Sequence, residues 1–192
     1  MPTEGISIIL PVHNEADSLR TVIEGIRREF QGLPHEIIAV DDGSTDGSFD
    51  TLAGLSQDGL VLIRHKRNKG YGFALKSGIR RAAYPNLLIV DADGSYPLGR
   101  LREIAGGLRE FDMVVGSRKL MLNLRTPARW FIRKLAEVLT GERIPDLNSG
   151  MRAMRKAETE RFTHLLPDGF SFTSTLTMAM FSNGLDVKYV PV

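Results

Sequence analysis

The strongest constraint on the fold is a regular alternation of short apolar runs with amphipathic stretches in the first half of the chain. Five runs rich in Ile and Val have the length of buried strands. Between the first two, Leu19, Val22 and Ile26 recur at the spacing of one helix face. Strands that alternate with helices predict an α/β fold with a mainly parallel sheet and right-handed crossovers. The predicted strands are residues 6–12, 36–41, 60–64, 87–91 and 112–116.

The remaining elements are predicted from the same periodicities. Further helices are expected near 46–57, 70–83 and 97–109, where Pro97 suits a first helical turn. No linker-like, low-complexity or repeated stretch divides the chain, so we expect a single domain over residues 1–192. In the less regular second half we expect a helix at 127–140, an extended segment at 150–155, helices near 156–165 and at 172–183, and a last strand at 186–191.

Composition excludes several classes of protein. The chain has no cysteine, which excludes disulfides, thiolate metal sites and a cysteine nucleophile. A formal net charge of +2 gives no argument for binding nucleic acid. No segment approaches the roughly 18 consecutive apolar residues of a membrane span. The N-terminus lacks the basic start and cleavage site of a signal peptide, so we expect a cytoplasmic location.

Polar turns follow three of the predicted strands, in "PVHNEADSL", "VDDGSTDGS" and "VDADGSYP". Ligands of parallel sheets bind beyond the carboxyl ends of the strands, where the strand order reverses. In extended backbone, Asp91 and Asp93 would point to the same side and repel each other unless a cation lies between them. Mg²⁺ takes such carboxylates together with substrate phosphates. The pair therefore indicates a metal-bound diphosphate, or else two aspartates that only cap a turn.

Two other motifs are less specific. The Asp-Asp-Gly-Ser sequence at 41–44 is either a simple turn or a site where Asp42 accepts hydrogen bonds from the base or ribose of a nucleotide. The stretch "NKGYGFALKSG" resembles a glycine-rich phosphate loop. It matches neither the P-loop nor the dinucleotide fingerprint, because Gly70 and Gly72 are followed by Ala74 and Leu75. A Rossmann oxidoreductase is therefore disfavoured.

The motifs taken together carry a more specific resemblance. "SIILPVHNEADSL", "IIAVDDGSTDGS", "NKGYGFALKSGIRRA", "LLIVDADGSYP" and "MVVGSR" occur in this order and at these separations. Together they resemble the family-2 inverting glycosyltransferases, which have the GT-A fold. "DLNSGMRAMRK" and "GFSFTSTLTMAMFSNGLDVKYVPV" are similar to the branch that makes polyprenyl-phosphate sugars, which includes the dolichol-phosphate mannose synthases. The resemblance covers essentially the whole chain.

The resemblance implies roles for particular residues. Residues 1–117 would be the half that binds the nucleotide sugar, and residues 118–192 the half that binds the acceptor. A divalent cation, Mg²⁺ or Mn²⁺, would be bound by Asp91 and Asp93, with Ser95 as a further ligand. Arg118 would contact phosphate, and Asn148 with Asp146 would shape the acceptor side. The residues lining the nucleotide-sugar site would be Pro11, His13, Glu15, Val40, Asp42, Asp91, Ala92, Asp93 and Arg118.

The chain departs from the family pattern at three places. His13 replaces a common tyrosine, and an imidazole can still stack or hydrogen-bond. Ser95 stands where the dolichol-phosphate mannose synthases carry a metal-binding glutamine; its hydroxyl can bind a metal or a metal-bound water. Those synthases also place basic residues after the last strand, whereas this sequence ends at Val192. Either the sequence is shortened, or another residue such as Lys188 supplies that charge.

Two features of the second half concern the acceptor. No acidic residue lies between Met113 and Ala136, where basic residues alternate with apolar ones and with Trp130. This pattern indicates either a helix in a membrane interface that also holds a lipid phosphate, through Arg129 or Arg133, or a solvated basic helix packed on the core. In addition, "FSFTSTLTMAMF" lacks the carboxylate that acts as general base in hydroxyl-using relatives. A phosphate acceptor needs no such base, because its second pKa is about 6.

The sequence thus predicts a metal-dependent inverting transferase at the cytosolic face of a membrane, bound there peripherally. It would move mannose or glucose from GDP-mannose or UDP-glucose to a polyprenyl phosphate, dolichyl or undecaprenyl. Asp91, Asp93 and Arg118 would be the catalytic residues. Two alternatives stay open: transfer to a hydroxyl of a glycan or glycolipid, with Asp146 or Asp168 as base, and a catalytically idle module that binds the sugar nucleotide.

Overall fold

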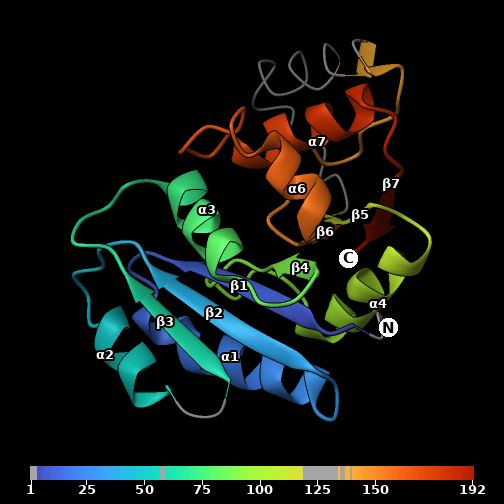
Figure 1. The fold of residues 1–192 in the computed structure, drawn as a ribbon. Helices are drawn as coiled ribbons and strands as arrows, with labels where there is room; N and C mark the ends of the chain where they lie inside the picture. The colour runs from blue at the N-terminus through green and yellow to red at the C-terminus, as the bar shows by residue number, and fades with distance from the viewer. Residues whose placement is uncertain (1–3, 57–58, 119–133, 135–136, 139) are drawn as a thin grey trace.

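The protein has three layers, a seven-stranded sheet with helices on both faces (Figure 1). The structure, a computed structural model, describes residues 4–56, 59–118, 134, 137–138 and 140–192. The strands lie in the order β3-β2-β1-β4-β6-β5-β7. Their bounds are β1 Ile6–Val12, β2 His35–Asp41, β3 Leu60–Arg64, β4 Asn86–Ile89, β5 Met113–Ser117, β6 Arg152–Arg155 and β7 Val187–Pro191.

The strand order reverses next to β1. The chain runs outward from β1 through β2 to β3 and then returns to place β4 on the other side of β1, and all of these neighbours pair in parallel. The segments that follow β1 and β4 therefore leave the same edge of the sheet side by side, at a topological switch point.

Strand β6 is the exception to the parallel arrangement. It pairs antiparallel with both β4 and β5, while β5 and β7 are parallel to each other. The residues that precede β6 therefore lie at the same edge as those that follow β4 and β5. Because β6 runs in this direction, the segment before Arg152 lies next to the turns that follow the strands of the first half.

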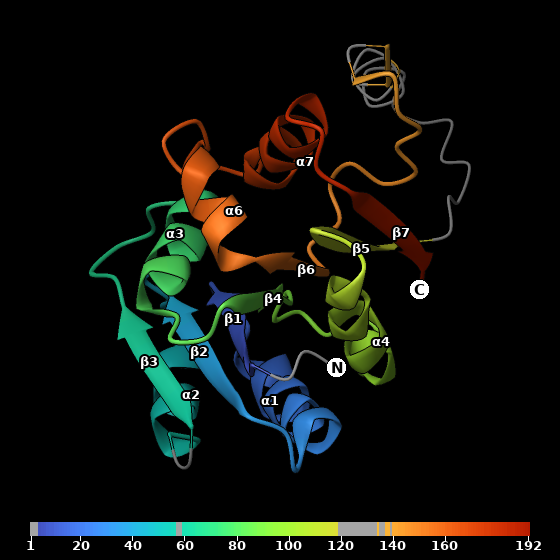
Figure 2. The ribbon, with the colours of Figure 1, turned by 45° about the vertical axis from the view of Figure 1, so that its right-hand side comes forward.

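Helices cover each face of the sheet (Figure 2). Alternate strand residues face opposite sides: Ile8 and Leu10 pack with the helices of one face, and Ile9 packs with those of the other. The first face carries α1 (Ala16–Phe30), α2 (Ser48–Gly54) and α4 (Leu101–Gly106, between short 3-10 turns), and the second carries α3 (Tyr71–Arg81), α6 (Lys156–Phe162) and α7 (Phe172–Ser182).

The structure confirms the predicted α/β fold and nearly all predicted elements, with shifts of a few residues at their ends. It corrects one expectation that matters for the site, because β4 ends at Ile89 and not at Asp91. The predicted helix at 127–140 falls largely outside the described residues. Among the helices that are described, none is both long and apolar enough to cross a membrane.

The close contact between α3 and β1 generates a prediction about stability. A Cβ added at Gly78 would lie 2.5 Å from Cγ2 of Ile9, in the interior of the sheet. We expect Gly78→Ala to lower the free energy of unfolding by about 1–3 kcal/mol, since overpacking outweighs the gain in helix propensity. Urea denaturation measures this change. The matched control is Gly54→Ala in α2, where a Cβ would meet nothing within 4 Å; an equal loss in both variants would contradict the prediction.

Candidate active site at the switch point

The turns after β1 and β4 bring three carboxylates together: Glu15, Asp91 and Asp93. The hydroxyl of Ser18, in the first turn of α1, donates a 2.5 Å hydrogen bond to the carbonyl of Ala92 and so ties the two turns to each other. The side chain of Asp91 is partly buried, while Asp93 is exposed. Because β4 has already ended, both aspartates come from a turn and not from the extended backbone that the sequence suggested.

Asp91 is held from two sides. The hydroxyl of Tyr71, the first residue of α3, donates to its Oδ1 at 2.9 Å. On the other side its carboxylate lies against the Cα of Gly150, so closely that a Cβ at residue 150 would collide with it. Asp93 is fixed more locally, since its Oδ1 accepts a 2.9 Å hydrogen bond from the backbone N–H of Ser95.

The charges of this cluster oppose one another. Burial, assisted by the nearby Asp93, raises the pKa of Asp91 above its ordinary value, against the lowering effects of the Tyr71 hydrogen bond and of Arg152. Burial together with Asp93 and Asp46 likewise raises the pKa of Glu15. Such carboxylates remain ionised most readily when a cation lies between them.

The donor chemistry fits a hard divalent cation. The described residues contain no cluster of three or more potential ligands from Asp, Glu, His and Cys that could by itself hold a metal ion. Asp91 and Asp93 offer two carboxylates, and Mg²⁺ commonly takes one or two carboxylates and completes its shell with phosphate and water. Ser95 is exposed beside them. Its predicted role as a ligand remains a prediction.

The turns after β1 and β2 are connected by hydrogen bonds between side chain and backbone. The backbone N–H groups of Asn14, Glu15 and Ala16, at the start of α1, donate to Ser44 Oγ, Ser48 Oγ and Asp46 Oδ2 at 3.0, 2.8 and 3.1 Å. These bonds satisfy donors that a helix N-terminus leaves free. The "HNEA" and "DDGSTDGS" segments therefore form one rigid rim of the site.

The predicted nucleotide-pocket residues of this rim differ in what they expose. Pro11 and Val40 are partners in the β1–β2 register and are buried. His13 is exposed, and its Nδ1 donates to the carbonyl of Asp42 at 3.0 Å. It thus stands beside the end of β2 with its ring available to a ligand. Val40 has no exposed surface in this structure, so its predicted contact with a nucleotide, like that of Pro11, remains a prediction.

Asp42 is occupied by its own chain. Its buried carboxylate accepts hydrogen bonds from Nδ1 of His65 at 2.6 Å and from the backbone N–H groups of Lys69 and Gly70 at 3.0 and 2.8 Å. His65 in turn contacts Ser77 Oγ through Nε2 at 3.1 Å. In this structure Asp42 therefore orders the loop before α3; the direct contact of Asp42 with a nucleotide remains a prediction.

The glycines of "NKGYG" have a packing role. A Cβ at Gly70 would lie 2.6 Å from the carbonyl oxygen of Asp168, and one at Gly72 would collide with the carbonyl of Pro167. The backbone N–H of Phe73 also donates to the carbonyl of Asp168 at 3.0 Å. These glycines therefore let the loop between α6 and α7 approach the start of α3, which explains their pattern without a phosphate loop.

Arg118 follows β5 at the same edge of the sheet. Its Nε donates to Oδ2 of Asp146 at 3.2 Å, and its guanidinium lies 5.6 Å from the ring centre of Tyr96. Partial burial would lower the pKa of Arg118, but Tyr96, Asp146 and Asp91 outweigh it and raise that pKa above its ordinary value. Arg118 thus stays a cation with half of its side chain exposed.

The other candidates of the second half divide into three groups. Asn148 is exposed in the turn that follows Asp146, and its backbone N–H donates to that carboxylate at 3.1 Å. Lys188 lies over the ring of Phe111, before β5, which is the opposite edge of the sheet. The structure therefore does not bring Lys188 to the site. Arg129 and Arg133 lie outside the described residues.

Four residues that the sequence did not single out support the site through packing and hydrogen bonds. Tyr71 and Gly150 hold Asp91, as described above. Ser149 donates to the carbonyl of Gly116 at 2.5 Å. Arg152 is fully buried and donates to the carbonyls of Ser149 and Thr173 at 2.6 and 3.0 Å. Nothing in the local sequence of β6, Arg-Ala-Met-Arg, distinguishes the buried Arg152 from the partly exposed Arg155.

Comparisons with known proteins agree with this arrangement. The model of the family described as glycosyl transferase family 2 matches residues 7–162. An undecaprenyl-phosphate mannosyltransferase from Micrococcus luteus is 30% identical, over 96% of this chain and 81% of that protein. An undecaprenyl-phosphate 4-deoxy-4-formamido-L-arabinose transferase from Serratia proteamaculans is also 30% identical, over 81% of this chain and about half (50%) of that protein.

A solved structure extends the likeness to three dimensions. The glucosyl-3-phosphoglycerate synthase of Mycobacterium tuberculosis, crystallised with Mn²⁺, UDP and glucosyl-3-phosphoglycerate, matches 98% of this chain and 70% of its own with a TM-score of 0.81. At 22% identity this match establishes the fold, which is GT-A as predicted.

The raised pKa of Asp91 gives a prediction about stability and pH. An acid whose folded pKa exceeds its unfolded pKa destabilises the native state at pH values above both, and this penalty disappears as the pH falls through them. We therefore expect Asp91→Asn, which still accepts the Tyr71 hydrogen bond, to raise the free energy of unfolding at pH 7 in the presence of a chelator. The gain should fade as the pH approaches the ordinary value of 3.8. Urea unfolding across this pH range tests it, and a pH-independent or negative difference would refute it.

Proposed function

The chain belongs to glycosyltransferase family 2, and we propose that it transfers a hexose from a nucleoside-diphosphate sugar to a polyprenyl phosphate. The choice of a phosphate acceptor rests on the carboxylates of the second half, one of which would have to act as general base toward a hydroxyl acceptor. Helix α7 contains none. Asp146 is bound by Arg118 at 3.2 Å, and Asp168 by Lys76 at 2.8 Å. Each of these two carboxylates is therefore already engaged in an ion pair in this structure.

A phosphate acceptor makes such a base unnecessary. Its second pKa is about 6, so at neutral pH it is largely a dianion and already nucleophilic. Both curated relatives named above carry undecaprenyl phosphate in their names. Their similarity to this chain supports an acceptor of the same class.

The donor would lie at the switch point. His13, exposed at the end of β1, would contact the nucleoside, and the rim formed by the turns after β1 and β2 would hold it in place. Asp91 and Asp93 would bind the divalent cation, Mg²⁺ or Mn²⁺, that accompanies the diphosphate. When bound, that cation supplies positive charge to stabilise the departing diphosphate. Tyr71 and Gly150 keep the Asp91 carboxylate in position.

The reaction would be a single displacement. One oxygen of the acceptor phosphate forms a bond to the anomeric carbon while the bond from that carbon to the nucleoside diphosphate breaks, which inverts the configuration. The electron pair of the broken bond leaves with the diphosphate, and no proton need be removed. Arg118, still cationic and half exposed, would orient one of the phosphates. Orientation and charge would account for most of the rate enhancement.

The basic and apolar segment between Met113 and Ala136 fits this acceptor, which resides in a membrane. Its larger part, with Arg129 and Arg133, lies outside the described residues, and its contact with lipid at the cytosolic face of a membrane remains part of the proposal. We also propose that residues 1–117 bind mainly the donor and residues 118–192 mainly the acceptor.

A transfer assay tests the proposal. We expect product from UDP-glucose or GDP-mannose with undecaprenyl phosphate in detergent, none with a panel of sugar hydroxyls, and none after chelation of divalent cations. Asp93→Asn should lower turnover by about 100-fold or more, because it removes an expected ligand. Asp17→Asn, exposed on α1, is the matched control and should leave turnover unchanged.

Two results would overturn the proposal. Product with sugar hydroxyls alone would favour the glycan or glycolipid transferase. Metal-dependent binding of the nucleotide sugar with no transfer to any acceptor would favour an idle binding module.

A further inference from the structure

Phe170 is a large apolar side chain that is held in place and yet left open. It is 85% exposed, in the loop between α6 and α7. One face of its ring stacks on Tyr71, with ring centres 5.7 Å apart and an angle of 17° between the planes. An isolated exposed apolar residue is ordinary. An exposed ring fixed by stacking in a functional site is a candidate contact for a ligand.

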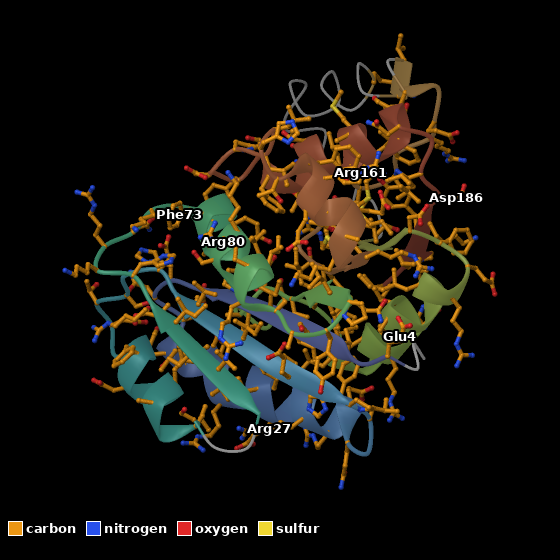
Figure 3. The ribbon with its side chains drawn as sticks, in the orientation of Figure 1. Glu4, Arg27, Phe73, Arg80, Arg161 and Asp186 are labelled. Carbon is orange, nitrogen blue, oxygen red and sulfur yellow. The ribbon has the colours of Figure 1, made fainter. Side chains whose placement is uncertain are left out.

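The loop that carries Phe170 is anchored to α3 just before the ring. Before it, Asp168 accepts hydrogen bonds from Lys76 at 2.8 Å and, through its carbonyl, from the backbone N–H of Phe73 at 3.0 Å. Around the ring, the backbone N–H of Phe172 donates to the carbonyl of Gly169 at 3.2 Å, a local bond that closes a turn about Phe170. The loop lies beside the start of α3, where Phe73 is labelled (Figures 1, 2 and 3). The position of the ring is therefore set by packing.

The two stacked rings are connected to Asp91 of the candidate active site. Tyr71, whose ring supports Phe170, is the residue whose hydroxyl donates to Asp91 Oδ1 at 2.9 Å. Phe170 is thus linked to Asp91 through the ring and hydroxyl of Tyr71, and it comes from the half of the chain proposed to bind the acceptor. A ligand held by its phosphate near Asp91 could extend an apolar tail onto this ring.

We propose that the outer face of Phe170 binds the isoprenoid chain of the acceptor next to its phosphate. This inference rests on the proposed function and names a subsite for it. The polar donor is expected at the carboxylates and the strand-end rim, whereas an isoprenoid offers methyl and methylene groups that gain by covering apolar surface. The one carboxylate of this loop, Asp168, is paired with Lys76 and so adds little repulsion toward an anionic lipid.

Binding of two phosphates that differ only in chain length tests the subsite. Isothermal titration calorimetry without donor would compare farnesyl phosphate with dimethylallyl phosphate, which carries a single isoprene unit. We expect wild type to prefer farnesyl phosphate. Phe170→Ala should weaken farnesyl phosphate binding by about tenfold, the effect of losing one aromatic face, and leave dimethylallyl phosphate within about a factor of two. Phe170→Trp should restore the preference.

Matched variants separate the chain contact from indirect effects. Leu165→Ala removes another exposed apolar side chain of the same region, 56% exposed and without a ring to stack on Tyr71, and should change neither affinity. Tyr71→Phe keeps an aromatic support but removes the bond to Asp91, and should keep the chain-length preference. An equal loss of both phosphates in Phe170→Ala, no loss of either, or the same loss in Leu165→Ala would overturn the subsite. If Phe170→Ala weakens binding of the nucleotide sugar but not of farnesyl phosphate, the ring contacts the donor and the subsite is also overturned.

These outcomes are distinct from a failure of the proposed function. A wild-type protein that discriminates between the two phosphates but transfers sugar only to hydroxyls would refute the proposed acceptor chemistry. A wild-type protein that transfers sugar to both phosphates with equal affinity would keep the proposed function and remove the role of Phe170.

Discussion

The carboxylate of Asp91 lies against the Cα of Gly150 and accepts a hydrogen bond from Tyr71, so that one partly buried group joins three separate segments of the chain. Burial and the neighbouring Asp93 raise the pKa of Asp91, so that its ionisation is less favourable in the free protein than in water. A cation bound between the two carboxylates would offset their repulsion and favour the ionised form of Asp91. The repulsion between these carboxylates is the physical reason to expect that the site depends on a divalent ion.

The topology of the sheet makes that junction possible. The switch beside β1 places the turn of Asp91 next to that of Glu15, and the antiparallel direction of β6 brings Gly150 to the same edge. Behind Gly150, the buried guanidinium of Arg152 links the carbonyl of Ser149 to that of Thr173 in α7. Burial lowers the pKa of Arg152, but an arginine remains charged. The Asp91 carboxylate and the first turn of α7 therefore share one internal scaffold.

Periodicity was sufficient to predict the strands, most helices and the edge at which Glu15, Asp91 and Asp93 meet, because these depend on local pattern and on the general behaviour of parallel sheets. The contacts that hold the site were not predictable in this way. Tyr71 and Gly150 reach Asp91 from distant parts of the chain, and only the three-dimensional packing brings them there. Asp42 shows a further limit of local pattern, since nothing in the sequence indicated that its carboxylate binds His65 and the backbone before α3.

The affinity of Gly150→Ala for a nucleoside diphosphate is the most direct test of this account. Gly150 has no left-handed backbone conformation, so the carboxylate of Asp91 is the main obstacle to a side chain there. We predict that the variant unfolds cooperatively, as wild type does, but binds UDP or GDP with Mn²⁺ at least about tenfold more weakly, because Asp91 is displaced. Wild-type affinity in this variant would contradict the central role given to the Asp91 carboxylate.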